Sequence, residues 1–457
     1  MRIQFVVHQF LPRHAAGTEI YTYHLARELG RRGHEVSIYT TEIRPDRPQY
    51  ELRRTEHDGL PIWEAVHNHA FPSFRRTYLD RRQEENFARV LDETRPDLVH
   101  FQHLHLHSIG YVDVARARGL PIVYTLHEYI LMCLRGGQLL PPEGPPCRGP
   151  DPELCAVCAR ELPAPTADEA PLPGPVEARV KAWLPGPLRR LVRRLRPGPA
   201  PAAAVAVADA DPYRAAVELR LAEVRRRLDD VDLFVSPSAF LRERFIANGF
   251  IRPERILHSD NGFFVEPFAD VRRSTSDELR VGFVGTIAPY KGVHLLVEAF
   301  QGLDRPGISC RIWGDLDTFP DYKARLLAMD RPANLEFAGR FDNSRIAEVL
   351  ADIDLLVVPS IWFENSPLTI HEAFLAGIPV LTADEGGMAE LVTDGVDGLH
   401  FRMGDAADLR ARLERLLHEP ALLAGMRRFP AIKTIAEDTD LMERRYEALL
   451  AGKVPTA

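Results

Sequence analysis

Two carboxylates, Glu364 and Glu372, form the strongest candidate site for ligand chemistry in this sequence. The stretch between them reads E-N-S-P-L-T-I-H-E and follows the apolar run Leu355–Pro359, which predicts a buried strand. Pro367 is typical of a first helical turn, so we expect a helix over Ser366–Ala376. A helix that begins at the carboxyl end of a parallel strand offers free N–H groups and a positive dipole end to a phosphate. We therefore expect a ligand with phosphate and hydroxyl groups here. The alternative is helix capping by one carboxylate and a buried ion pair at the other.

Three further strand-to-helix turns carry glycine, which lets the backbone approach a ligand closely. One spans Gly285–Gly292 and contains Lys291, a cation that could neutralise a phosphate. The others are Gly386–Gly387 and Ala16–Glu19. Each turn alone is more often a plain turn than a ligand site. Together they place four loops at the carboxyl ends of strands in two halves of the chain, and these loops converge if the two sheets face each other.

The elements that must position these loops alternate between strand and helix patterns. Short continuous apolar runs, such as Ile3–Val7, Val281–Gly285 and Ile308–Gly314, are typical of parallel strands covered on both faces. Helical spacing of apolar residues lies between such runs, as in Thr18–Arg32. Strict alternation predicts an α/β fold with doubly wound parallel sheets and right-handed crossovers.

Composition narrows the class of protein further. A chain of 457 residues is too long for one ordinary core, so two domains are expected. Hydrophobic residues make up 45% and charged residues 27%, which is ordinary for a soluble globular protein. The net charge of -8 offers no global basic field for nucleic acid. The segment Met1–Phe10 lacks a signal-peptide pattern, and no run approaches the roughly 18 to 20 apolar residues of a membrane span. These observations predict a cytoplasmic protein.

Four of the five cysteines lie close together in the sequence and invite a metal interpretation. Cys133, Cys147, Cys155 and Cys158 include one Cys-x-x-Cys pair, and four thiolates suit tetrahedral zinc. Without an export signal, disulfides are the less expected use. We predict a structural zinc site that fixes the loop after His127, with unligated thiols as the alternative.

Two other patterns are open to a structural and a functional interpretation. The run His100, His103, His105 and His107 could place imidazoles on one strand face, but residues that line a cleft are expected more than a metal site. The basic stretch Leu188–Arg196 could lie on an anionic membrane surface, at the inner membrane face. The alternative is a solvated helix in an insertion.

Residues 279–418 resemble the donor-binding domain of the retaining glycosyltransferases of family 4, which have the GT-B fold. The matching stretches are VGFVGTIAPYKGVHLLVEAF, DLLVVPSIWFENSPLTIHEAFLAGIPVLTAD and GGMAELVTDGVDGLHF. The first half is similar to the acceptor domain of that family through AAGTEIYTYHLARELGRRGHEV, PDLVHFQHLH, TLHEY and VDLFVSPSAFLRERF. The resemblance covers nearly all the chain except about 135–228.

This resemblance implies two Rossmann-like domains that face each other across a cleft. The acceptor-binding domain is expected over 1–265, with an insertion at about 135–228 that holds the cysteines and a Pro/Arg-rich segment. The domain that binds the sugar nucleotide is expected over 266–432. A C-terminal helix within 433–457 is expected to pack back on the first domain.

The resemblance also implies a role for each residue that matches the family motif. Glu364 would contact hydroxyls of the donor sugar, and Glu372 would bind the nucleotide ribose. Lys291 would neutralise the donor diphosphate. His127 would reach the donor sugar from the acceptor domain, and Gly17 would lie beside the diphosphate. The backbone of the helix start would cradle the sugar and phosphates; this start comprises Asn365, Ser366, Pro367 and Leu368.

Two positions depart from the family pattern. Thr286 stands where the family usually has Arg, which removes one cation from the diphosphate site. Lys291 would then carry more of the charge, with help from Arg340. Ala16 replaces the first glycine of a usual pair, a mild change. Gly387 keeps its glycine, and its backbone would approach the donor.

The function implied is retaining transfer of a sugar from a nucleotide-diphosphate sugar to an acceptor hydroxyl, in polysaccharide, glycolipid or related glycan biosynthesis. The acceptor would be a glycan or a lipid-linked hydroxyl, and the chemistry would need no cofactor beyond the sugar nucleotide. Catalysis would consist mostly of positioning and of stabilising the leaving charge. The alternatives are a sugar-nucleotide epimerase or hydrolase on the same fold, and a non-catalytic module that binds sugar nucleotides.

Overall fold

The first half of the chain forms an eight-stranded sheet in the order β3-β4-β2-β1-β5-β6-β7-β8. The computed structural model describes residues 1–69, 71–162, 211–269 and 271–455. All neighbouring strands in this sheet are parallel except the antiparallel pair β3 and β4. The strands are β1 (Arg2–Val7), β2 (Glu35–Glu42), β3 (Leu52–His57), β4 (Leu60–Val66), β5 (Leu98–Phe101), β6 (Ile122–Thr125), β7 (Leu233–Ser236) and β8 (Ile256–His258).

Helices cover both faces of this first sheet. Apolar side chains of α1 and α16 share one core with β1, and those of α2, α3 and α7 share a second core on the other face. The helices of this half are α1 (Gly17–Arg31), α2 (Arg81–Thr94), α3 (Tyr111–Arg116), α4 (Pro152–Arg160), α7 (Pro212–Leu228) and α8 (Ala239–Ala247). The continuous apolar pattern of the strands, such as fully buried β5, β6 and β7, follows from this double cover.

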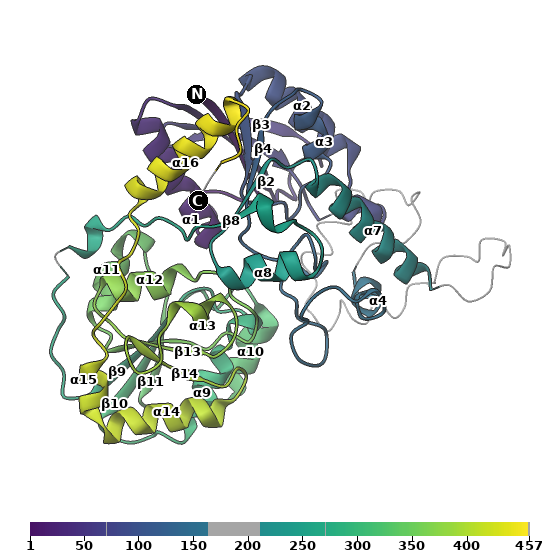
Figure 1. The fold of residues 1–457 in the computed structure, drawn as a ribbon. Coiled ribbons are helices and arrows are strands. Elements are labelled where there is room, and N and C mark those ends of the chain that lie inside the picture. Colours follow the sequence, from purple (N-terminus) through teal and green to yellow (C-terminus); the bar gives the residue numbers. More distant parts are fainter. Residues whose placement is uncertain (70, 163–210, 270, 456–457) are drawn as a thin grey trace.

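The second half forms a six-stranded, all-parallel sheet in the order β11-β10-β9-β12-β13-β14. Its strands are β9 (Leu279–Val284), β10 (Ile308–Trp313), β11 (Leu335–Gly339), β12 (Leu355–Val358), β13 (Val380–Ala383) and β14 (Gly398–Phe401). Its helices are α9 (Val293–Gln301), α10 (Pro320–Ala328), α11 (Ile346–Ala351), α12 (Leu368–Leu375), α13 (Gly387–Leu391), α14 (Ala406–His418) and α15 (Pro420–Gly425). Two doubly wound parallel sheets confirm the predicted α/β fold class (Figure 1).

The chain crosses between the two halves twice, and the crossings lie side by side. Phe263 donates its N–H to the carbonyl of Lys433 at 2.9 Å, and Ile435 donates to the carbonyl of Phe263 at 2.7 Å. The second crossing leads into α16 (Ile435–Leu450), which lies beside α1 in the first half (Figure 1). Arg32, which directly follows α1, donates to Glu443 of α16 at 2.6 Å. The domain boundaries predicted from the sequence stay predictions. In the described chain, the two connecting segments lie side by side between the two sheets.

Some parts of the fold differ from the expectation or lie beyond it. The hairpin of β3 and β4 was not expected, because β3 reads L-R-R-T-E-H and has only partly buried or exposed side chains. Helix α7 falls inside the expected insertion, yet Val217 and Leu221 are buried in the core. The basic stretch Leu188–Arg196 lies outside the described residues. None of the helices within the described ranges is long and apolar enough to cross a bilayer.

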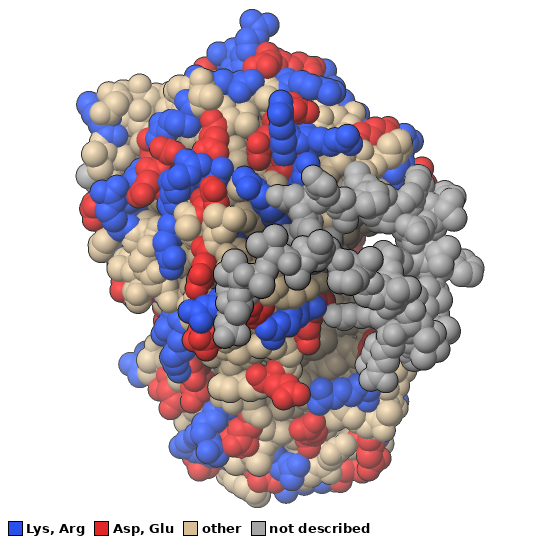
Figure 2. All heavy atoms as spheres, turned by 90° about the vertical axis from the view of Figure 1, so that its right-hand side faces the viewer, with Lys and Arg blue, Asp and Glu red and all other residues tan. Residues whose placement is uncertain are grey.

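Charged side chains of both signs are interspersed over the face of the molecule that Figure 2 presents. This mixture agrees with the modest net charge of -8. Where the described residues form that face, they show no extended basic surface of the kind that carries a nucleic-acid footprint.

Candidate functional site

Two helices from different halves of the chain begin against each other. Helix α12 starts at Leu368, two residues later than predicted, with Pro367 in the capping position and no side-chain cap. Helix α1 starts at Gly17, also without a side-chain cap. A Cβ atom on Gly17 would lie 3.5 Å from Cγ of Leu368, so the start of α1 lies against the first side chain of α12. Because each start carries unsatisfied N–H groups and a positive dipole end, their meeting point favours an anion.

The Glu364 carboxylate lies in the loop before α12 and is held by three donors. Its Oε1 atom accepts hydrogen bonds from Lys291 Nζ at 2.7 Å, Ser360 Oγ at 2.6 Å and Trp362 Nε1 at 2.8 Å. The residue is 5% exposed. Its Oε2 atom accepts no hydrogen bond from the described part of the chain. Glu364 therefore keeps one oxygen free for hydroxyls of a ligand, and Lys291 brings a cation to the same place.

Glu372 lies on α12, is partly buried and has a raised pKa. Burial raises the pKa of its carboxyl to about 7, against a smaller lowering by His371. Within the described ranges no side chain forms a hydrogen bond or ion pair with it, whereas the neighbouring His371 pairs with Asp260 at 2.7 Å. A carboxyl group that has a pKa near 7 and no partner among the described residues is suited to binding hydroxyl groups of a ligand.

His127 comes from the loop after β6 in the first half and lies near the same site. Its Nε2 donates to Gln102 Oε1 at 2.8 Å, and its ring lies 5.4 Å from that of Tyr21. Burial, followed by the charge of His8, lowers the pKa of His127 to about 3, so the imidazole is neutral. The carbonyl of the preceding Leu126 accepts a hydrogen bond from Asn365 Nδ2 at 3.1 Å. This bond joins the His127 loop directly to the loop before α12.

The side chains at the start of α12 mainly connect the two halves of the chain. Asn365 Oδ1 accepts from Ser238 Oγ at 2.6 Å, and Ser366 Oγ donates to Asp260 at 2.7 Å. Only their backbone groups are then open to a ligand. Gly387 lies against this loop, because a Cβ atom there would be 1.5 Å from the carbonyl oxygen of Asn365. The glycine is needed for the close approach of α13 to the loop.

Thr286 and Arg340, which were predicted to lie at the diphosphate, make contacts within the protein in this structure. Thr286 is half-buried in the turn after β9, and its carbonyl accepts from the N–H of Ala288. The Arg340 side chain is 73% exposed and pairs with Asp315 at 2.6 Å. The expected help of Arg340 at the diphosphate stays a prediction, and in this structure Asp315 already holds its guanidinium.

The four clustered cysteines lie near one another in the fold, and their use as zinc ligands stays a prediction. Cys133, Cys147 and Cys155 pack against the apolar core of the first half, and none of the four, Cys158 included, forms a disulfide. Burial, followed by the charges of the neighbouring thiols, raises the pKa of Cys147 and that of Cys155 to about 11. In the described ranges no group of three or more ligands is placed in the geometry that holds a metal ion.

The histidine run does not share one strand face. Strand β5 ends at Phe101, so only His100 is a strand residue; its Nδ1 lies 2.6 Å from the Tyr446 hydroxyl of α16. His103 and His107 are buried in the following loop. His105 lines a cavity of about 500 Å³ together with apolar side chains of the first half.

Several residues near the site were not predicted from the sequence. Ser360 and Trp362 bind Glu364, and Asp260 holds His371 and Ser366. A second carboxylate–imidazole contact, between Glu19 and His8, lies at the start of α1. Glu19 lies in the predicted turn Ala16–Glu19, His371 lies within the Glu364–Glu372 motif and His8 directly follows a predicted strand, but none of these patterns indicated the contacts.

Comparison with known proteins identifies the family. Residues 15–143 match the sequence model of Glycosyltransferase Family 4, and residues 253–429 match that of Glycosyl transferases group 1. The two matches fall on the two sheets and include every predicted donor-site residue. The chain belongs to the family 4 type of glycosyltransferases.

Curated members of related function align with part of this family 4 chain. Glycogen synthase of Mycobacterium tuberculosis is 33% identical over 175 residues, which are 36% of this chain and 40% of that protein. D-inositol 3-phosphate glycosyltransferase of Nocardia farcinica is 35% identical over 155 residues, 32% of this chain and 34% of that protein. The chain therefore aligns with about 40% or less of the length of these two relatives.

Solved structures share the fold over almost the whole family 4 chain. Sucrose-phosphate synthase from Thermosynechococcus elongatus superposes with a TM-score of 0.64 at 17% identity, covering 99% of this chain and 100% of that one. Anabaena HepE in complex with UDP and glucose gives a TM-score of 0.59 at 16% identity, covering 96% and 94%. At this identity the likeness concerns the fold, and it confirms the predicted GT-B arrangement.

Proposed function

We propose that this protein is a retaining glycosyltransferase that moves a sugar from a nucleotide-diphosphate sugar to an acceptor hydroxyl. One observation carries the proposal: the uncapped starts of α1 and α12 lie so near each other that a Cβ atom on Gly17 would be 3.5 Å from Leu368 Cγ, and Lys291 binds Glu364 in the loop before α12. Two positive helix ends and an ammonium group match the charge of a diphosphate. The names of the family relatives, glycogen synthase and D-inositol 3-phosphate glycosyltransferase, agree with sugar transfer.

Each side chain at the site has a task in the proposed reaction. The diphosphate would lie against the two helix starts at Gly17, which has no side chain to obstruct it. The free oxygen of Glu364 would accept hydrogen bonds from hydroxyls of the donor sugar, and Glu372 would accept those of the ribose. The neutral imidazole of His127 would approach the sugar from the acceptor domain. These contacts fix the donor before reaction, which is the main source of rate in such positioning catalysis.

Charge develops on the diphosphate as the bond between the anomeric carbon and the phosphate oxygen breaks. Lys291 Nζ is 2.7 Å from Glu364 Oε1, so the ammonium group already lies at the site and can bind the leaving phosphate as its negative charge develops. The helix starts contribute fixed dipoles that need no reorganisation during reaction. Attack by the acceptor hydroxyl on the face that the diphosphate leaves would give retention of configuration.

The acceptor is proposed by its chemical class alone. We propose a glycan or lipid-linked hydroxyl that reaches the first half of the chain, and contact with a membrane surface remains part of that proposal. The Streptomyces coelicolor relative named exopolysaccharide phosphotransferase, 31% identical over 140 residues, agrees with glycan assembly.

A donor screen tests the proposal. Thermal shift with UDP-, GDP-, ADP- and CMP-sugars should show stabilisation by one class of donor. With that donor, Lys291→Ala should lower turnover by about 10²- to 10³-fold, the usual cost of losing one group that stabilises a leaving charge. Lys323→Ala is the matched control, since Lys323 is a surface residue of the same domain that pairs with Asp317.

Product analysis separates the proposed function from its alternatives. NMR of the glycoside should show the anomeric configuration of the donor. Release of free sugar whatever the acceptor would favour a hydrolase, and donor binding without turnover would favour a binding module. No stabilisation by any sugar nucleotide would overturn the proposal.

A further inference from the structure

The cavity of about 500 Å³ in the first half of the chain has no role in the steps above. It is lined by the loops that follow β4, β5 and β6. Its volume falls in the range of about 300–1,000 Å³ that is typical of small-molecule sites. Most of its lining is apolar, so it favours an apolar group over a fully hydroxylated one. The apolar side chains of the loops after β5 and β6 are Leu104, Leu106, Ile109, Ile130, Leu131 and Leu134.

The walls of this cavity continue the loops that reach the proposed donor site. His127 and Gln102 join these loops by a hydrogen bond of 2.8 Å. Leu104 of the cavity wall lies two residues after Gln102, and Ile130 lies three residues after His127. The carbonyl of the residue before His127 accepts a hydrogen bond from Asn365, in the loop before α12, at 3.1 Å. A ligand in the cavity therefore lies beside the loops where the donor sugar would be bound.

The charged side chains of the lining already bind protein groups. Arg135 pairs with Glu161 at 2.6 Å. Arg220 is 5% exposed and donates to carbonyls of the loop after β6. A phosphate or carboxylate on the ligand would compete with these contacts, whereas a neutral ligand leaves them intact. The charges of the described lining therefore favour a neutral ligand.

Two histidines give the cavity neutral polar groups. His69 and His105 lie in the lining, and neither imidazole forms a hydrogen bond with another described residue. Burial lowers the pKa of His105 to about 3 and also lowers that of His69, so both rings are neutral at pH 7. A neutral imidazole has one N–H donor and one acceptor nitrogen, which suits hydroxyl groups.

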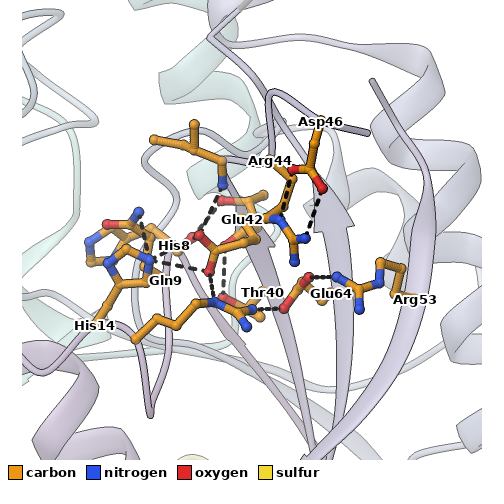
Figure 3. A network of polar contacts seen from close by, with 12 residues as sticks. His8, Gln9, His14, Thr40, Glu42, Arg44, Asp46, Arg53 and Glu64 are labelled. Atoms are coloured by element: carbon orange, nitrogen blue, oxygen red, sulfur yellow. Dashed lines mark hydrogen bonds and ion pairs between the residues drawn. The ribbon is translucent and has the colours of Figure 1, made fainter. Parts of the chain in front are cut away.

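The loops around the cavity have fixed backbone conformations. Leu106 has a φ of 63° and His69 a φ of 51°, which residues other than glycine adopt only where the surrounding structure holds them. A network of ion pairs ties the loop after β4 to the sheet (Figure 3): Arg13 donates to Glu42 at 2.8 Å, and the carbonyl of Glu42 accepts the N–H of His67 at 2.9 Å. Walls that are set before a ligand arrives lower the ordering cost of binding.

Part of the lining comes from a region that neither family model matches. Glu161, Leu162 and Arg220 belong to residues 144–252, between the two matches. This region forms α4, α7 and the residues around them in the described chain. The shape of the cavity is therefore particular to this chain, and the class of its ligand has to be read from its own lining.

We propose that this cavity binds the apolar part of a neutral acceptor, an alkyl or aryl group next to the hydroxyl that receives the sugar. The leucine and isoleucine side chains bury that group, and His69 and His105 bind neighbouring hydroxyls. The receiving hydroxyl then lies toward the loops of Gln102 and His127, where the donor sugar would meet it. This inference rests on the proposed function and specifies its acceptor, as a neutral amphipathic molecule and not a phosphorylated sugar.

Saturation-transfer NMR on the full-length protein tests the cavity without turnover. The probes are octyl, phenyl and methyl β-D-glucopyranoside and glucose 6-phosphate, with the octyl glucoside below its micelle concentration. Octyl or phenyl glucoside should bind with a Kd about tenfold or more below that of methyl glucoside, because the cavity removes their apolar groups from water. The tighter of the two distinguishes an alkyl from an aryl acceptor. Equal binding of all probes, or tightest binding of glucose 6-phosphate, would overturn the proposal.

A variant that fills the cavity locates the binding. Leu134→Trp places a larger side chain in the lining and should raise the Kd of the preferred probe by about tenfold or more, with the Kd of the nucleotide sugar within twofold of wild type. Leu134→Ala, which truncates the same half-buried side chain, should weaken the probe by about fivefold. Leu219→Trp is the matched control, since Leu219 is 48% exposed on α7 and outside the lining. Wild-type probe binding in both Leu134 variants would overturn the location.

Turnover tests whether the bound molecule is the acceptor. Release of nucleoside diphosphate from the donor is measured with octyl and phenyl glycosides of glucose, galactose, mannose and N-acetylglucosamine. At least one should accelerate release, and Leu134→Trp should raise its KM by about tenfold with kcat within twofold. Binding in the cavity without acceleration by any of these glycosides would overturn the acceptor role. A wild-type protein that no sugar nucleotide stabilises would instead contradict the proposed function itself.

Discussion

At the scale of single residues, the candidate site consists of carboxyl groups whose surroundings differ. Glu364 is held by Lys291, Ser360 and Trp362, all on one oxygen. Glu372 has no partner of this kind in the described chain, and burial raises its pKa to about 7. One carboxylate is therefore oriented by three donors, whereas the other has no such partner and changes charge near neutral pH. The two carboxyl groups of the same sequence motif thus differ in their surroundings.

Glu372 should make donor binding depend on pH. If its carboxylate accepts hydrogen bonds from ribose hydroxyls, the ionised form binds better, so affinity should increase as the pH rises through about 7. Between pH 6 and 8 the ionised fraction grows by about tenfold, and the donor Kd should fall by a similar factor. Calorimetric titration with a nucleotide sugar measures this, because its phosphates stay ionised over that range.

Glu372→Gln is the control for this pH dependence. The variant should bind the donor more weakly at pH 8, with a Kd that no longer changes between pH 6 and 8. The unfolding free energy adds a second check. The folded pKa lies above the model-peptide value, so ionisation costs stability as the pH rises from about 4.5 to 7, and the variant should lose that decline. A pH-dependent Kd in Glu372→Gln would assign the dependence to another group.

Site residues that belong to a recognisable sequence motif could be predicted from the sequence. Glu364, Lys291 and His127 could be singled out before the fold was known, and the structure brings Glu364 and Lys291 into contact. His8 and Glu19 could not be paired, because their contact depends on how β1 and α1 meet. The zinc prediction stays a prediction: the four thiols form no disulfide, and three of them pack partly buried against the core.

At the scale of elements, the site depends on helices that start close to other backbone. Gly387, the first residue of α13, donates its N–H to the carbonyl of Glu364 at 2.7 Å. Added atoms at this position would displace the loop that carries Glu364 and Asn365. The glycine predicted as a ligand contact is thus, in this structure, also a packing requirement between α13 and the start of α12.

Gly387→Ala should destabilise the protein and weaken donor binding. The added Cβ atom would lie 1.5 Å from the carbonyl oxygen of Asn365, so the loop must shift. Forcing such a group into a packed site costs about 1–3 kcal/mol, measurable as a lower unfolding midpoint in urea. Gly30→Ala is the matched control, since nothing lies within 4 Å of its added Cβ inside α1. The control should be neutral or stabilised by up to about 1 kcal/mol. Equal effects of the two substitutions would contradict this explanation.

The order and type of the main elements could be predicted from the sequence, but edge elements could not. Continuous apolar runs identified central strands such as β5 and β12, since burial on both faces leaves few polar positions. Strand β3 is an edge strand with exposed charged residues and lacks that pattern. Helix α12 begins later than its sequence pattern suggested, because Pro367 has an extended backbone conformation in the capping position.

At the scale of the whole molecule, specific polar contacts hold the two halves together at the site. Both oxygens of Glu390, on α13, accept hydrogen bonds from the first N–H groups of α8, Ala239 and Phe240, each at 2.8 Å. Asn365 adds bonds to Ser238 and Leu126. Arg148 pairs with Glu385 across the same boundary at 3.0 Å. The structure is therefore a closed arrangement in which helix α8 is capped by the opposite domain.

Removal of the Glu390 carboxylate should shift the protein toward an open arrangement. Hydrogen bonds to a charged group contribute about 1.5–3 kcal/mol, so Glu390→Ala should weaken donor binding by roughly tenfold or more and increase the radius of gyration. Small-angle scattering and calorimetry measure these two quantities. Glu336→Ala is the control, because Glu336 is exposed on β11 and, among the described residues, pairs with Arg311 of its own domain alone. An unchanged radius with unchanged affinity would show that this contact does not hold the closed form.

The central claim is that the meeting point of α1 and α12 binds the diphosphate of a sugar nucleotide. Its most direct test is a crystal structure with the nucleotide sugar selected by the donor screen. The account predicts phosphate oxygens at about 3 Å from the N–H groups of Leu368 and Thr369 and from Lys291 Nζ, with the sugar between Glu364 and His127. A nucleotide bound elsewhere, with the two helix starts still in contact and Lys291 still on Glu364, would contradict it.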